Sequence, residues 1–87
     1  MKIVKQVILR TIAGESMLVP VGDTVTKYNG LFVMTPSAKL LWEAIQEGKE
    51  EDELAAVLVD AYGIDPQMAK EDSDAFVAKL RELEIVE

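Results

Sequence analysis

The sequence predicts an α+β domain with a winged-helix-like outline: a three-stranded antiparallel sheet followed by three helices. The first third of the chain is rich in residues that suit strands, whereas helix caps and helical apolar spacing occur only later. Elements segregated in this way are typical of α+β folds. The 87 residues contain no repeat, linker or low-complexity tract, so we expect one domain over residues 1–87.

The first two strands are expected to form a hairpin. Residues 3–13 are rich in Ile, Val, Leu and Thr, and residues 16–21 form a second, shorter run. Gly14-Glu15 between them is predicted as a tight turn. Pro20 has no N–H to donate, which predicts that it lies at the end of its strand or on an unpaired side.

The third predicted strand is a continuous apolar run. Residues 22–30 are expected to form a loop that ends in the turn dipeptide Asn29-Gly30, and the strand that follows reads Leu31, Phe32, Val33, Met34. Because side chains alternate between the two faces of a strand, both faces of this one need cover. One face can pack on the domain's own helices, which leaves the other face, or the free backbone edge, for a partner. A core strand covered on both faces fits the same run.

The first predicted helix starts at a capping signal. Thr35 is a suitable N-cap, and Pro36 has its φ preset for the first helical position. Gly48 is placed to end the helix with a positive φ. One apolar stripe is expected along the helix: Ala38, Leu41, Trp42 and Ile45.

Two further helices are predicted. One runs over about residues 50–62 and ends at Gly63, with a stripe of Leu54, Val57, Leu58 and Ala61. The other begins at Asp65-Pro66 and runs to about residue 83, with a stripe of Ala69, Ser73, Phe76, Leu80 and Leu83. Ile85 and Val86 are expected to pack back on the core.

The composition narrows the chemistry. There is no cysteine and no histidine, which removes thiol nucleophiles, thiolate metal sites and the usual general base. The sequence also lacks a phosphate-binding Gly-rich loop and an EF-hand pattern, so we expect no metal site and no cofactor. The N-terminal run is broken by Lys5, Gln6 and Arg10, and no apolar segment approaches membrane-spanning length, so a soluble cytoplasmic protein is expected.

The net charge of −7 is unevenly distributed. Residues 1–46 hold five Lys and Arg against three Asp and Glu, whereas residues 47–87 hold four against thirteen. An acidic second half argues against nucleic-acid binding, which needs clustered basic residues. Both an ordinary solvated surface and a face that steers a basic peptide or enzyme fit this charge distribution.

The order and spacing of several short motifs resemble the PqqD-like family, peptide-binding modules that are also called RiPP recognition elements. The likeness covers nearly the whole chain, and each motif is unspecific alone. The chain departs from the family in its first helix start, where Thr35-Pro36-Ser37-Ala38 replaces the commoner Asn-x-x-Gly or Asn-x-x-Ala. The motifs are Val19-Pro20-Val21, Asn29-Gly30-Leu31-Phe32, Thr35-Pro36-Ser37-Ala38, Leu41-Trp42-Glu43, Gly48-Lys49, Glu53-Leu54, Tyr62-Gly63-Ile64-Asp65, Asp72, Phe76, Leu80 and the ending from Leu83 to Val86.

The resemblance implies binding without chemistry, so we expect no catalytic residue and no enzyme activity. Family members capture the leader segment of a ribosomally made precursor peptide and deliver it to a modifying enzyme, often a radical SAM enzyme. The leader adds as a strand to the third strand and lies in a groove shared with the third helix. On this chain the implied peptide-binding residues are Tyr28, Leu31, Phe32, Val33, Met34, Ser73, Phe76, Val77 and Leu80.

A second reading of the fold is a winged-helix-like regulatory or assembly module that acts as a dimer. A DNA-reading helix needs a basic face, yet the third predicted helix carries four acidic residues against Lys70, Lys79 and Arg81. Peptide binding is therefore the preferred reading. A free sheet edge can also pair with a second copy, so a monomer and a weak or swapped dimer both fit the sequence.

Overall fold

The sheet begins with a β-hairpin whose turn has two residues. The computed structural model describes residues 1–4, 7–21 and 32–87. Strands β1 (Val7–Ile12) and β2 (Glu15–Pro20) pair antiparallel. The turn consists of Ala13 and Gly14, with φ of +54° and +83°, the positive values that match the twist of a tight hairpin. The predicted turn at Gly14-Glu15 is therefore wrong by one residue, because Glu15 already pairs with Ile12 in the ladder.

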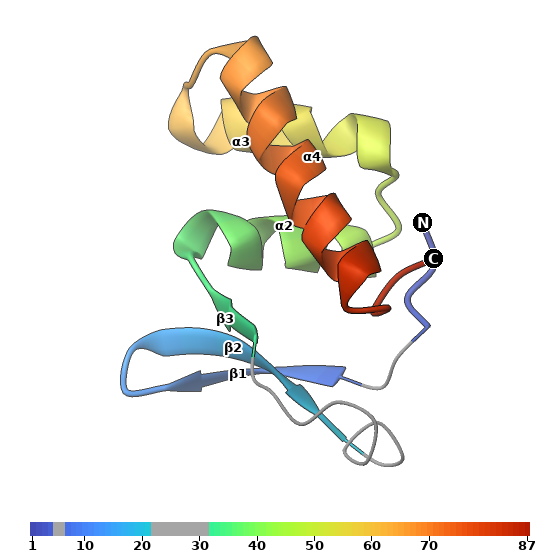
Figure 1. Cartoon of the computed structure of the whole chain (residues 1–87). Coiled ribbons are helices and arrows are strands. Elements are labelled where there is room, and N and C mark those ends of the chain that lie inside the picture. The colour runs from blue at the N-terminus through green and yellow to red at the C-terminus, as the bar shows by residue number, and fades with distance from the viewer. Residues whose placement is uncertain (5–6, 22–31) are drawn as a thin grey trace.

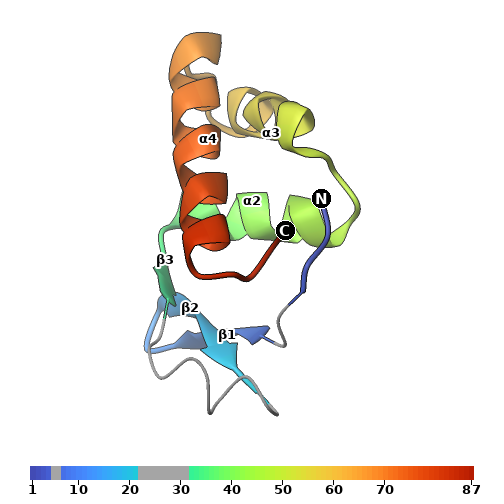
Figure 2. The same cartoon turned by 45° about the vertical axis from the view of Figure 1, so that its right-hand side comes forward.

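The predicted first strand is divided in the structure. Ile3 lies in an isolated bridge with Val86, and β1 begins only at Val7. The C-terminal segment turns at Glu84, where φ is +58°, and returns to the core, where Ile85 and Val86 are 0% and 3% exposed. The expected packing of this ending is confirmed, and it holds the two ends of the chain side by side (Figures 1 and 2).

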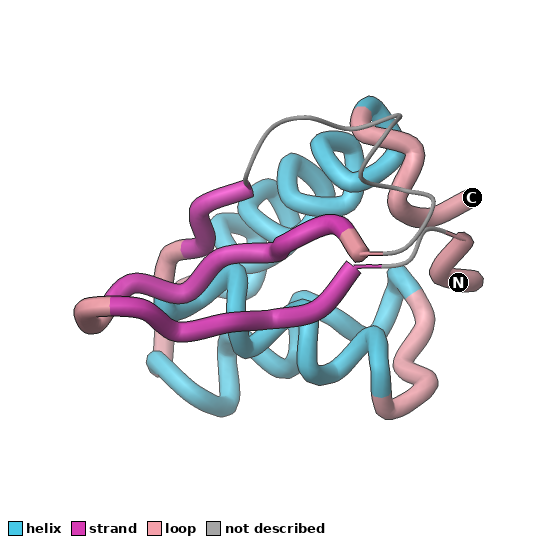
Figure 3. The backbone as a smooth tube through the Cα atoms, turned by 90° about the horizontal axis from the view of Figure 1, so that it is seen from below, coloured by secondary structure: helices cyan, strands magenta, loops and turns pink. Residues whose placement is uncertain are grey.

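Strand β3 (Phe32–Met34) completes the sheet at one edge. It pairs antiparallel with β2, with Val33 opposite Met17, in the strand order β1-β2-β3. Figure 3 shows the three strands lying across the helices, which cover one face of the sheet. The predicted loop and its Asn29-Gly30 turn lie outside the described residues.

Helix α2 (Pro36–Gln46) begins as predicted. The Thr35 hydroxyl accepts a hydrogen bond from the Ala38 N–H at 3.2 Å, and Pro36 occupies the first turn. Gly48 follows the helix with φ of +99°. Of the predicted stripe, Ala38 is half-buried and the rest is buried: Leu41, Trp42 and Ile45.

The second predicted helix begins with a 3₁₀ turn, η1 (Glu51–Glu53), and continues as α3 (Leu54–Tyr62). Leu54 and Leu58 are buried, but Ala61 near the end of the helix is exposed. The predicted stripe is thus one member too long, since the last residues of α3, 60–62, are all exposed.

Helix α4 (Pro66–Glu82) is the longest element and packs along α3. The Asp65 carboxylate caps it by accepting hydrogen bonds from the N–H groups of Gln67 and Met68 at 3.0 and 3.3 Å. The predicted stripe is buried from Ala69 to Leu80, and Leu83 after the helix is half-buried.

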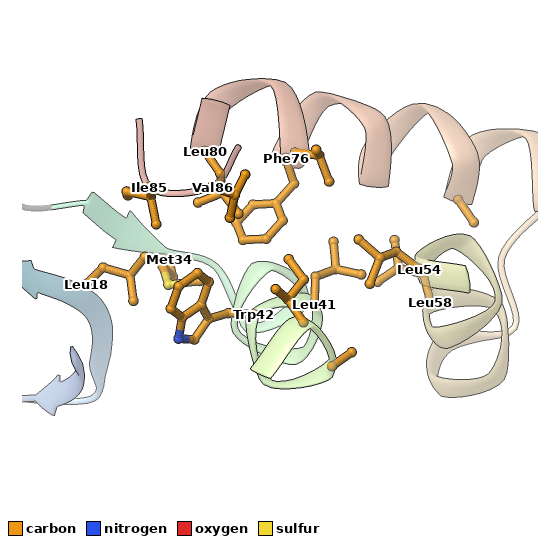
Figure 4. Packing of buried hydrophobic residues seen from close by; sticks show 14 residues of the cluster. Leu18, Met34, Leu41, Trp42, Leu54, Leu58, Phe76, Leu80, Ile85 and Val86 are labelled. Carbon is orange, nitrogen blue, oxygen red and sulfur yellow. The ribbon is translucent and has the colours of Figure 1, made fainter. Parts of the chain in front are cut away.

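The core lies between the sheet and the helices. Figure 4 shows Phe76 and Leu80 of α4 pointing towards Leu41 and Trp42 of α2. Leu18 and Met34 approach from the sheet, and Ile85 and Val86 lie below α4. The predicted α+β architecture, a three-stranded antiparallel sheet followed by three helices, is confirmed.

Candidate functional site

The outer edge of β3 lies beside α4, and an aromatic pair links the two elements. The rings of Phe32 and Phe76 meet edge to face, with centroids 6.2 Å apart and planes at 64°. Among the described residues β3 pairs only with β2, so one row of its backbone N–H and C=O groups has no partner strand. Such an edge is a template for an additional strand.

The two faces of β3 differ as its alternating side chains require. Phe32 and Met34 point inward with Leu18 and Ser16, their partners in β2, and Met34 is 4% exposed. Val33 points to the outer face and is 60% exposed. The expectation that one face packs on the helices while the other face or the edge stays uncovered is met over these three residues.

A groove of about 380 Å³ runs along this edge. We call it the β3–α4 groove. It is lined by β3, by the first part of α2, by the middle of α4 and by Leu58 of α3. Its lining is mainly apolar, with a few hydroxyls and one carboxylate, as is typical of peptide and small-molecule grooves. The lining residues are Phe32, Val33, Thr35, Ser37, Ala38, Leu41, Leu58, Asp72 and Phe76.

Three of the predicted helix residues lie away from the groove surface. Val77 and Leu80 are fully buried in the core. Ser73 is 1% exposed and donates a hydrogen bond to the Lys70 carbonyl at 3.1 Å. Of the four predicted positions on α4, Phe76 lines the groove. Tyr28 and Leu31, two predicted positions before β3, lie outside the described residues.

Two α4 residues that the sequence reasoning missed face the groove side. Met68, Asp72 and Phe76 follow one another at four-residue spacing and share one ridge of the helix. Asp72 lines the β3–α4 groove. Met68 is 52% exposed, and a large apolar side chain beside the core stripe was the available signal for this second face.

A second hollow, of about 310 Å³, continues the groove towards the start of α4. We call it the α3–α4 hollow; it shares Ser37, Leu58 and Asp72 with the β3–α4 groove. Its full lining is Pro36, Ser37, Leu58, Tyr62, Ile64, Met68 and Asp72.

The other flank of α4 carries a larger hollow of about 570 Å³. It is lined mostly by polar and charged residues: Glu50, Glu51, Asp52, Ala55, Pro66, Lys70, Ser73 and Asp74. Within it, Lys70 and Asp74 are joined at 2.7 Å, and this bond to Asp74 raises the pKa of Lys70 above 10.5. The hollow is remote from the β3 edge, so we do not assign the binding site to it.

The described residues contain no group of three or more Asp or Glu side chains arranged to hold a metal ion. In the same residues no helix is long and apolar enough to cross a membrane. What the geometry offers is a backbone edge and an apolar groove, which are the elements of recognition by strand addition.

The molecule is therefore a small winged-helix-like α+β domain, and within its described residues one sheet edge has no partner strand and lies beside a helix-walled groove. The family model for coenzyme PQQ synthesis protein D (PqqD) matches residues 8–86. The chain belongs to the PqqD family, as its motifs led us to expect.

A solved structure of the same fold is that of TbiB1 in complex with the TbiA(beta) leader peptide. The TM-score is 0.79, the sequences are 24% identical, and the match covers 100% of this chain and 95% of that chain. No curated protein matches the sequence.

Proposed function

We propose that this domain binds the leader segment of a ribosomally made precursor peptide by adding it as a strand to β3. The observation that carries the proposal is the edge of β3 next to the β3–α4 groove, which pairs with no other strand in the described part of the chain. Backbone hydrogen bonds along the edge supply affinity for any extended segment, and alternate side chains that enter the groove supply selectivity. Membership of the PqqD family supports this function, as does a structural relative solved with a leader peptide.

The proposal assigns different tasks to the predicted site residues. Phe32, Val33 and Phe76 contact the peptide, while the buried residues Met34, Ser73, Val77 and Leu80 hold β3 and α4 in place. Tyr28 and Leu31 remain predicted contacts.

The proposed role is recognition without catalysis. The domain presents the bound peptide to a separate modifying enzyme in the cytoplasm, and a radical SAM enzyme is one such partner. We propose that the β3 edge is open in a monomer or in a weak dimer, since a dimer paired through β3 would compete with the peptide.

An NMR titration tests the proposal directly. The probe is a synthetic leader peptide of a precursor encoded beside this gene, added to labelled protein. We expect saturable amide shifts confined to β3, the start of α2 and α4, with a micromolar Kd, which corresponds to about −8 kcal/mol. A flat titration, repeated with the neighbouring enzyme present and still flat, would overturn the proposal.

A pair of tryptophan variants locates the site. Ser37→Trp fills the groove from the first turn of α2, whereas Glu43→Trp adds the same side chain at an exposed position of the same helix. We expect the first to weaken peptide binding by about tenfold or more, which is about 1.4 kcal/mol, and the second to leave it unchanged. Equal affinities in the two variants would place the peptide elsewhere.

A further inference from the structure

The β3–α4 groove and the α3–α4 hollow form one continuous surface. Thr35, Pro36 and Ser37 directly follow β3, and Ser37 lines both depressions. Along α4 the surface follows the ridge of Phe76, Asp72 and Met68 away from the sheet. In Figure 1, α4 crosses in front of α2 and reaches from the level above the sheet up to α3, so its length spans the distance from the sheet to α3. A peptide that runs along β3 and continues past its C-terminal end enters the α3–α4 hollow.

The lining of the α3–α4 hollow is suited to bind an apolar side chain. Tyr62 and Met68 are 50% and 52% exposed, and Ile64, which also lines the hollow, is half-buried. Large apolar side chains left this open beside a groove are characteristic of interaction surfaces. Met is also suited to such a site, because its flexible thioether adapts to different side chains.

Asp72 lines both depressions, and among the described residues it is the one charged side chain that lines either of them. It makes no hydrogen bond or ion pair with any residue in the described part of the chain, unlike other carboxylates of α4. Glu71 accepts a hydrogen bond from Gln67, and Asp74 pairs with Lys70. A carboxylate left without a partner in a mainly apolar groove favours a cationic group in whatever covers it.

We propose that the bound peptide has two parts: a strand that pairs with β3, and a flank with a Lys or Arg facing Asp72 and an apolar or aromatic side chain in the α3–α4 hollow. The inference rests on the proposed function and names the class of peptide that the same site selects. The rest of the sheet is antiparallel, and an added strand of that polarity brings its N-terminal flank to the hollow. The net charge of −7 favours the approach of such a basic segment.

Selection from a displayed random peptide library tests this inference. The baits are the wild-type domain and Asp72→Lys, with Asp60→Asn as a control at an exposed α3 position outside the groove. We expect wild type and the control to enrich peptides in which Lys or Arg and an aromatic or aliphatic residue flank a strand-forming stretch. Asp72→Lys should enrich Asp or Glu at the same place.

Affinities of the selected peptides provide the second measurement. Asp72→Asn should lower the affinity for basic peptides by about threefold to fivefold at low salt. The difference in affinity between wild type and variant should shrink as the salt concentration rises. Met68→Ser should weaken the binding of peptides that have an aromatic residue in the flank, but not the binding of peptides that have glycine at the same position. Both residues are exposed, so these variants should fold, which circular dichroism checks.

The outcomes separate this inference from the function on which it rests. If the selected peptides bind at β3 with no charge preference, or bind Asp72→Asn as tightly as wild type, the inference of a two-part peptide is wrong. Strand addition to β3 would still stand. A selection that enriches no peptide, together with a flat leader titration, would overturn both.

Discussion

Phe76 belongs both to the core and to the wall of the β3–α4 groove. Its ring is 8% exposed, packs among core residues of α2 and meets Phe32 edge to face. The position of β3 against α4 therefore depends on a contact between two aromatic rings. A groove wall fixed in this way is present before a peptide binds, which lowers the entropy cost of recognition.

A double-mutant cycle measures that contact. Phe32→Leu and Phe76→Leu should each destabilise the fold, and the double variant should lose less than the sum by about 0.5–1.5 kcal/mol. The measurement is urea unfolding followed by the fluorescence of Trp42, the one tryptophan of the chain, which is 1% exposed.

Val33 provides the control for this cycle. It lies next to Phe32 but on the opposite face of β3, so Val33→Ala combined with Phe76→Leu should be additive. An equal coupling for the Val33 pair would mean that the cycle reports a general change in β3 and not the ring contact.

At the scale of elements, α2 fixes the end of β3. The strand ends at Met34 and Thr35 caps the helix. Pro36 and Ser37, which follow, line the α3–α4 hollow. The cap therefore sets the angle at which the chain leaves β3. Its loss should affect both the stability of the fold and the binding of peptide at the β3 edge.

Removing the cap tests this role. Thr35→Ala takes away the acceptor of the Ala38 N–H and should cost about 1 kcal/mol in the free energy of unfolding. Thr35→Ser keeps a hydroxyl and should restore most of it. Urea unfolding gives both values, and equal losses for the two variants would show that the hydroxyl does not act as the cap.

The same elements show which features the sequence could predict. Thr35, Asp65 and Gly48 act through neighbours within four residues, so their roles follow from local chemistry alone. The exposed face of α4 was harder to predict. Ser73 and Asp72 are adjacent in the chain, and which of them faces the groove depends on where β3 lies, a long-range contact that helical spacing does not contain.

At the scale of the whole molecule, ion pairs on α4 contribute pH-dependent stability. The Lys70 ammonium donates a hydrogen bond to Asp74 at 2.7 Å, and this bond, with the attraction between the charges, raises the pKa of Lys70 above 10.5. Hydrogen bonding to Glu51 likewise raises the pKa of Arg81. Because both folded-state pKa values are raised, these pairs stabilise the fold below the unfolded pKa values and lose that effect at alkaline pH.

Lys70→Gln should therefore remove part of the alkaline loss of stability. The wild-type free energy of unfolding should fall relative to that of the variant as pH rises through the raised pKa of Lys70, above 10.5. The effect should be small, since the pair is exposed to solvent. Lys49→Gln, at an exposed position with no ion pair among the described residues, should follow the wild type across the same range.

The bridge between Ile3 and Val86 has a consequence for how this domain can be joined to others. Both ends of the chain emerge at one point, with the Val4 N–H bonded to the Ile85 carbonyl at 2.8 Å. A short connection between the ends would allow circular permutation, and a single loop of a carrier protein could receive the whole domain as an insert. The β3 edge would then be oriented by two closely spaced covalent connections to the carrier protein instead of one linker.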